Sequence, residues 1–89
     1  MLEAAEDGDW EKYVDDYYGE QHKFKSSSDR DKLVSRFREK WGIQVIAGLK
    51  EASQVEPELS EDGTQAIFQL SNGEFILYKN EEGNWTFHL

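Results

Sequence analysis

The last third of the chain alternates short apolar–polar segments with turn signals, which is typical of an antiparallel β-meander. We predict three strands, Thr64–Leu70, Glu74–Lys79 and Trp85–Leu89. An Asp-Gly turn precedes the first of them, and Asn-Gly and Gly-Asn turns separate the three. Glycine next to aspartate or asparagine supplies the positive φ angles that tight hairpins need. A short edge strand is expected around Val55–Leu59, because Pro57 cannot donate a hydrogen bond to a neighbouring strand.

The first half of the chain shows helical spacing of its apolar residues instead. Asp9 is suited to cap a first helix that runs from Trp10 to about Phe24, although Gly19 weakens its last turn and can end it earlier. A second helix is predicted from Asp29 to Trp41, with Gly42 as its C-terminal stop.

The segment 43–53 carries two patterns. Its first three residues alternate as a strand does, whereas Ile43, Ile46 and Lys50 recur at helical spacing. Because leucine, alanine, lysine and glutamate are frequent after residue 46, we predict a third helix over Ile43–Ala52, with a strand as the alternative.

Together these elements predict an α+β fold, with three N-terminal helices packed on one face of a four-stranded antiparallel β-meander. Residues 1–8 are acidic and end in glycine, so we expect a flexible acidic tip, followed by a single domain over residues 9–89. The expected core combines the apolar stripes of the helices with one face of the strands: Trp10, Val14, Tyr17, Leu33, Phe37, Trp41, Ile46, Leu49, Phe68, Leu70, Leu77, Trp85 and Phe87.

The strong negative charge of the chain excludes some classes of binding partner. The formal net charge of −9 at pH 7 repels phosphate backbones and anionic lipid surfaces, which argues against nucleic-acid binding. No apolar run approaches the length of about 20 residues that spans a bilayer. The chain has no cysteine, so disulfides and thiol chemistry are absent. Its compartment stays open between the cytoplasm and an exported, periplasmic or lipoprotein-type domain that has lost its signal.

No catalytic residue, metal site or cofactor is predicted. In the last strand His88 alternates opposite to Trp85 and Phe87, so its side chain is expected to face solvent or a partner, and neither histidine has neighbours at metal-ligand spacing. Tyr13 and Tyr17 form an aromatic stripe on the first helix, which fits either a core or the lining of a pocket.

The predicted strand Glu74–Lys79 is apolar on both faces over Phe75–Tyr78, which is unusual for a surface left to solvent. It therefore indicates a sheet-mediated homodimer, or a face that binds a protein partner or a small apolar ligand. The candidate residues for this ligand or partner face are Tyr13, Tyr17, Ile67, Ile76 and Tyr78.

Two short motifs carry a family resemblance. Gly8-Asp9-Trp10 at the entrance of the first helix, and Glu-Gly-Asn-Trp-Thr-Phe over Glu82–Phe87, resemble the cone-fold nuclear transport factor two-like superfamily. More narrowly, they resemble its short bacterial branch related to lumazine-binding-like lipoprotein domains. The resemblance implies that Trp85 of the last strand is a core anchor between sheet and helices.

These observations favour a non-enzymatic binding or protein-interaction domain that uses an apolar pocket or sheet face. The alternative is a small cone-fold enzyme, isomerase-like or dehydratase-like, that acts on a hydrophobic small molecule. That alternative requires an ionisable group inside an apolar cavity, and its candidates are Asp16, Tyr13, Tyr17 and His88.

Overall fold

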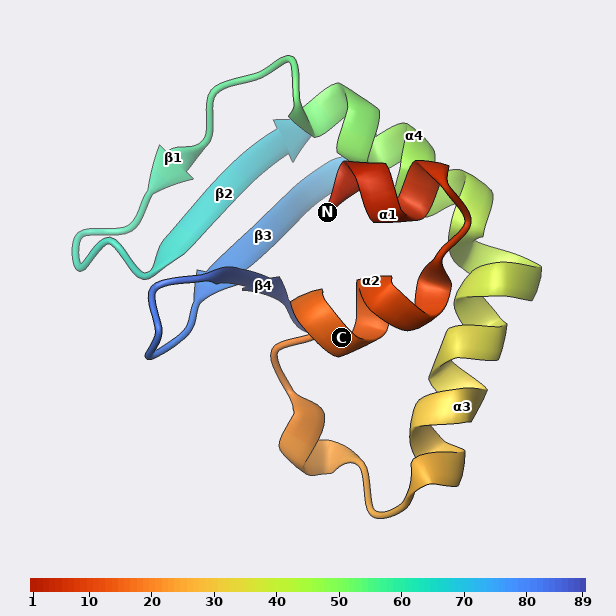
Figure 1. Cartoon of the computed structure of the whole chain (residues 1–89). Coiled ribbons are helices and arrows are strands. Elements are labelled where there is room, and N and C mark those ends of the chain that lie inside the picture. Colours follow the sequence, from red (N-terminus) through yellow and green to blue (C-terminus); the bar gives the residue numbers. More distant parts are fainter.

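The computed structural model describes all residues, 1–89, and places the helices before the sheet in chain order (Figure 1). The predicted α+β class is confirmed. The helical elements, in chain order, are α1 (Leu2–Glu6), α2 (Trp10–Tyr17), the 3-10 turn η1 (Gln21–Lys23), α3 (Ser27–Arg36), the π turn η2 (Phe37–Trp41) and α4 (Gly42–Ala52). The strands are β1 (Glu58–Leu59), β2 (Gln65–Leu70), β3 (Gly73–Lys79) and β4 (Trp85–Phe87).

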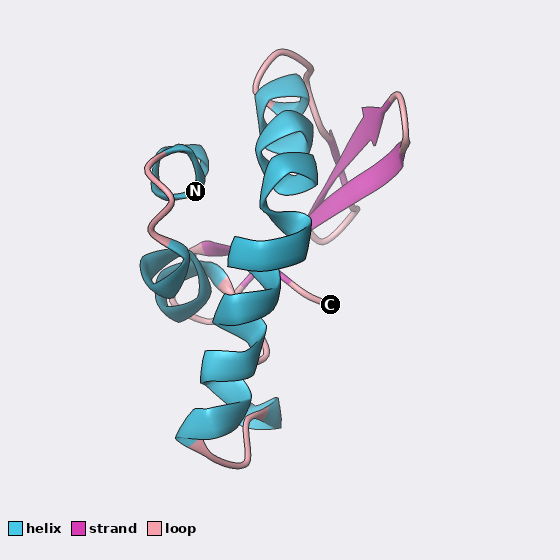
Figure 2. Ribbon diagram, turned by 90° about the vertical axis from the view of Figure 1, so that its right-hand side faces the viewer, coloured by secondary structure: helices cyan, strands magenta, loops and turns pink.

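The four strands form one antiparallel sheet in the order β1-β2-β3-β4, as the meander pattern predicts. The register places Ala66 beside Leu77 and Leu77 beside Phe87, so these three side chains share one face. That face meets the helices, because Phe87 belongs to the core and Leu77 packs against it. Ile67 and Ile76 are paired on the opposite face. In Figure 2 the helices gather on one side of the β2–β3 hairpin.

Strand β1 is shorter than expected. Pairing begins only at Glu58, after Pro57, and covers two residues in place of the predicted Val55–Leu59. It is an edge strand, as predicted from the missing proline N–H.

The acidic start of the chain differs from the expected flexible tip. Residues Leu2–Glu6 form the helix α1, and Ala4 and Ala5 are buried in the core. Small side chains allow this short helix to lie close to its neighbours, while Glu3 and Glu6 stay exposed. The composition of the segment is acidic, but its two alanines decide how it packs.

Helix α2 begins as predicted and ends early. The Asp9 carboxylate caps it by accepting a hydrogen bond from the Lys12 backbone N–H at 3.2 Å. The helix stops at Tyr17 and not near Phe24, because the chain then runs beside β4 and the Gly19 N–H donates to the Phe87 carbonyl at 2.8 Å. This pairing with the sheet replaces further helical hydrogen bonds.

The predicted stop at Gly42 is wrong. Gly42 has helical angles, φ −56° and ψ −45°, and the chain continues from α3 through the π turn η2 directly into α4. Gly42 is needed there because of close packing: a Cβ atom would lie 2.8 Å from the Phe37 carbonyl oxygen and 2.9 Å from Cζ2 of Trp10. The predicted third helix is confirmed, and the strand alternative for this segment is wrong.

The core is partly as predicted. Trp10, Val14, Leu33, Phe37, Leu49 and Phe87 are buried, whereas Tyr17, Trp41, Ile46 and Leu77 are partly buried at its margin. Phe68, Leu70 and Trp85 are also only partly buried. The prediction missed Ala4, Ala5, Tyr13, Tyr18, Val34, Ala52 and Ala66, which are buried.

Trp85 is not the core anchor that the resemblance implied. It pairs with Lys79 at the outer end of β4, and Nζ of Lys79 lies 5.8 Å from the centre of its ring. Phe87, two residues further along the same face, is the aromatic side chain of β4 that packs among the helices.

The two glycines of α4 provide a matched test of the close packing of Gly42 against Phe37 and Trp10. Gly42→Ala is expected to lower the free energy of unfolding by about 1–3 kcal/mol, because the new methyl group meets backbone and the Trp10 ring. Gly48→Ala is the control: its Cβ would meet only Leu70 Cδ1, at 3.9 Å, so the variant is expected to be as stable as the wild type or up to about 1 kcal/mol more stable. Urea denaturation measures both, and equal effects would contradict the packing role of Gly42.

The turn before β2 provides a test by pH. The Asp62 carboxylate accepts hydrogen bonds from the hydroxyls of Thr64 and Ser60, both at 2.7 Å, and these lower its pKa to about 2. Since the folded pKa is below the unfolded value of about 3.9, Asp62 stabilises the turn at neutral pH, and this contribution is lost as the pH falls towards 2.

We expect a carbon-detected NMR titration of the Asp62 carboxyl to show a midpoint near pH 2. In Thr64→Val, which keeps the shape and the backbone N–H but removes the hydroxyl, the midpoint should move up towards the ordinary value. An unchanged midpoint in that variant would show that the Thr64 hydroxyl does not set this pKa.

Candidate functional site

An open apolar cleft lies between the π turn, α4 and the adjoining ends of β2 and β3. Its volume is about 320 Å³, and eight of the ten residues that line it are hydrophobic. The lining residues come from α2, η2, α4, β2, β3 and the end of the chain: Tyr13, Phe37, Trp41, Gln44, Val45, Gly48, Leu49, Leu70, Phe75 and Leu89.

The cleft exists because α4 carries more apolar surface than the core covers. Of its residues only Leu49 and Ala52 are buried, whereas Val45 and Ile46 are half-buried and Ile43 is 86% exposed. A helix that is apolar on most of its sides is normally enclosed by protein. Here one side of α4 is left open above the sheet.

Gly48 lines the cleft and leaves space in it because it has no side chain. The position lies on the side of α4 that faces β2, and the nearest atom that an added Cβ would meet is Leu70 Cδ1, at 3.9 Å. Any larger side chain at this position would occupy the space between α4 and the sheet.

Tyr13 forms part of the cleft floor. Its ring stacks on Phe87 with centroids 4.7 Å apart and meets the edge of Phe37 at 5.2 Å. The residue is only 2% exposed, yet its hydroxyl has no hydrogen-bond partner in the protein. No buried polar side-chain atom of the structure lacks a partner, so this unpaired hydroxyl has access to open space. The cleft is the cavity that Tyr13 lines.

The cleft has no charged side chain in its lining. Burial raises the pKa of Tyr13 far above its ordinary value, because the ionised form would lose its hydration. The hydroxyl is therefore neutral at every physiological pH and offers one donor and its lone pairs in apolar surroundings.

The five residues of the predicted ligand or partner face do not form one site. Tyr13 lines the cleft, whereas Tyr17 lies in a separate, polar depression beside Asp16 and Trp85. The other three, Ile67, Ile76 and Tyr78, are half-buried on the opposite face of the sheet.

His88 lies outside the cleft, on the exposed surface. Its ring stacks on Tyr78 with centroids 3.9 Å apart and planes 4° apart, on the sheet face that points away from the helices. The expectation from strand alternation that His88 faces outward is confirmed.

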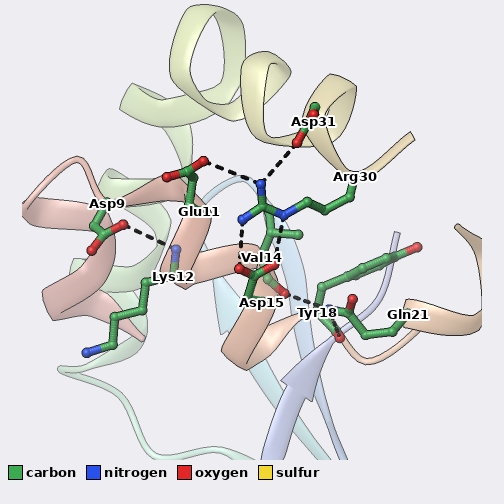
Figure 3. A network of polar contacts seen from close by, with 9 residues as sticks. All are labelled: Asp9, Glu11, Lys12, Val14, Asp15, Tyr18, Gln21, Arg30 and Asp31. Atoms are coloured by element: carbon green, nitrogen blue, oxygen red, sulfur yellow. Dashed lines mark hydrogen bonds and ion pairs between the residues drawn. The ribbon is translucent and has the colours of Figure 1, made fainter. Parts of the chain in front are cut away.

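Two acidic residues of α2, Glu11 and Asp15, lie outside the cleft lining and bind Arg30 of α3. Figure 3 shows Arg30 of α3 among Glu11, Asp15 and Asp31, with Nε and Nη2 of Arg30 donating to the two oxygens of Asp15 at 2.9 and 2.7 Å. This bidentate hydrogen bond lowers the pKa of Asp15. The cluster is exposed and links α2 to α3, so its carboxylates do not serve the cleft.

No group of three histidine, cysteine, aspartate or glutamate side chains is placed to hold a metal ion. No helix combines the length and the apolar character that a membrane crossing requires.

Sequence reasoning missed most of the cleft lining, including Gln44, Gly48 and Phe75. One signal was present: the apolar residues of segment 43–53 fit a helix and a strand pattern at once, because they cover more than one helical face. Such an excess indicates a helix with two apolar contacts to make.

Comparison with known proteins gives no relative: no family model, no curated protein and no solved structure matches the chain.

Removing the Tyr13 hydroxyl gives a test of its surroundings. Because the hydroxyl has no protein partner, Tyr13→Phe should change the free energy of unfolding at pH 7 by less than about 0.5 kcal/mol. At alkaline pH the two proteins should differ. The folded pKa of Tyr13 lies above the unfolded value of about 10, so Tyr13 contributes stability below pH 10 that is lost as the pH rises towards the folded pKa.

The measurement is urea denaturation of both proteins at pH 7, 9 and 11. The wild type is expected to lose more stability than Tyr13→Phe between pH 9 and 11, whereas Tyr18, whose pKa is also raised, is present in both proteins and cancels. Parallel loss of stability would contradict a buried, neutral Tyr13.

Proposed function

We propose that this chain is a non-enzymatic binding domain whose site is the apolar cleft between α4 and the sheet. The observation that carries the proposal is the open hollow itself, of about 320 Å³, lined almost entirely by hydrophobic side chains with one accessible hydroxyl. Ligand sites are typically concave and apolar with few polar groups, and this volume lies at the lower end of their range of about 300–1,000 Å³.

The exposed apolar side chains of α4 support the proposal. Burial of apolar surface contributes about 25 cal/mol for each Å² removed from water. Binding of a ligand or partner over the cleft is therefore favoured by the apolar surface that it would bury there. Ile43 at the start of α4 and Leu89 at the end of the chain are 86% and 61% exposed. Both positions border this part of the molecule and can add to the buried area.

The enzymatic alternative is less well supported. Of its four candidate groups only Tyr13 lies in the cleft, whereas Asp16 and His88 are exposed elsewhere. General acid–base catalysis works best with a pKa near the operating pH, and the pKa of Tyr13 is shifted away from it. An isomerase or dehydratase would need a base beside the substrate, and no other ionisable side chain lines the cleft.

The outer face of the sheet is a second candidate surface. Ile67, Ile76 and Tyr78 line none of the cavities, and each is half-buried by its neighbours. We therefore favour the cleft, and a homodimer through the outer face stays a prediction. Membership of the nuclear transport factor two-like superfamily also stays a prediction.

The proposal is tested by filling the cleft. Gly48→Leu places a side chain between α4 and Leu70, so it is expected to weaken binding of the neutral apolar dye N-phenyl-1-naphthylamine at least tenfold, which is about 1.4 kcal/mol. Dye fluorescence measures the affinity, and amide NMR shifts in α4 locate the dye.

Ala47→Leu is the matched control, because it adds the same side chain to the exposed side of the same helix and outside the cleft lining. This variant should bind the dye as the wild type does. If the wild type binds no dye, or if both variants bind it equally, the cleft is not the binding site.

A further inference from the structure

The floor of the cleft presents a polar group that the fold itself does not use. The Tyr13 hydroxyl makes no hydrogen bond within the protein, and it keeps access to open space although the residue as a whole is only 2% exposed. An occupant of the cleft would exclude water from this hydroxyl, and a polar group that loses water without gaining a new partner costs free energy. An unpaired donor at the base of a hollow therefore points to a partner that comes from outside.

The surroundings of the hydroxyl restrict that partner. The neighbouring side chains are aromatic or aliphatic: Phe37, Trp41, Leu49, Leu70 and Phe75. They favour an apolar body, and Gln44 is the one other residue of the lining with a polar side chain. A ligand that matches the cleft is thus apolar over most of its surface and polar at one point.

The polar point on the ligand must be uncharged. No lysine, arginine or histidine lines the cleft, so a buried carboxylate or phosphate would have no counter-charge and would lose its hydration. The net charge of −9 further disfavours an anionic ligand. A neutral hydroxyl is well suited to donate to a neutral carbonyl oxygen.

We propose that the cleft binds an apolar small molecule with one uncharged hydrogen-bond acceptor, such as a ketone or ester carbonyl, and that Tyr13 Oη donates to it. This inference rests on the proposed function and names the class of ligand. An apolar protein side chain such as leucine or phenylalanine would also fill the hollow, but it has no acceptor and would leave the hydroxyl unpaired. The acceptor is the feature that separates the two occupants.

The test compares ligands of the same shape. 2-Acetylnaphthalene has a carbonyl, 2-isopropenylnaphthalene replaces it with a methylene group, and 2-naphthoate carries a charge. We expect the wild type to bind the ketone about fivefold more tightly than the hydrocarbon, as a neutral hydrogen bond gives, and to bind the carboxylate more weakly than the ketone. Amide NMR titration gives each affinity and shows whether the shifts lie around the cleft.

Tyr13→Phe is the decisive variant, because it removes one oxygen atom from a hydroxyl that supports no other group. The variant is expected to bind the ketone and the hydrocarbon equally and to keep the wild-type affinity for the hydrocarbon.

Equal binding of ketone and hydrocarbon by the wild type, or an unchanged preference in Tyr13→Phe, would overturn the role of Tyr13 while the cleft remains a binding site. Tighter binding of the carboxylate would overturn the uncharged class, and failure of all three probes together with the dye would overturn the proposed function itself.

Discussion

The stacking of Tyr13 on Phe87 is the contact on which the rest of the structure depends. Tyr13 lies on α2, Phe87 on β4, and Phe37 at the start of the π turn meets both rings edge-on, so three aromatic side chains join α2 and the π turn to the sheet. A chain of 89 residues without cysteine has neither disulfides nor a metal site to supplement its core. Large rings compensate, since each buries a large apolar area.

This aromatic cluster also explains why the cleft is where it is. It holds the helices against β4 and the nearer end of β3, where Leu77 and Phe87 lie side by side. At the other end of the hairpin, the Ser71 N–H and hydroxyl donate to the Glu51 carboxylate of α4 at 2.7 and 3.0 Å, and Leu70 and Phe75 line the cleft beside this attachment. The same side chain, Tyr13, closes the core on one side and forms the floor of the cleft on the other.

The sequence was informative where short-range rules decide the structure. Turn dipeptides predict the meander, Asp9 predicts the start of α2, and helix-forming residues predict α4. It misled where packing at a distance decides. Gly42 looks like a helix stop, but its lack of a side chain serves the contact with Trp10. Trp85 and Phe87 share one strand face, and only the position of the helices determines which of them is buried. The cleft could not be predicted, because it depends on how α4 packs against the sheet and not on any short-range pattern.

The π turn over Phe37–Trp41 has a consequence for how this domain can change. A π turn closes its hydrogen bond at i+5 in place of i+4, so it holds one residue more than an α-helical turn. Each residue advances an α-helix by about 100°, and α4 is therefore rotated by about that angle relative to a straight continuation of α3. Loss of a single residue in this turn would bring a different side of α4 to the sheet and would remove Gly48 from its place opposite Leu70. The presence of a hollow in this domain thus depends on the length of one turn, which a one-residue insertion or deletion can alter without changing any residue of the cleft.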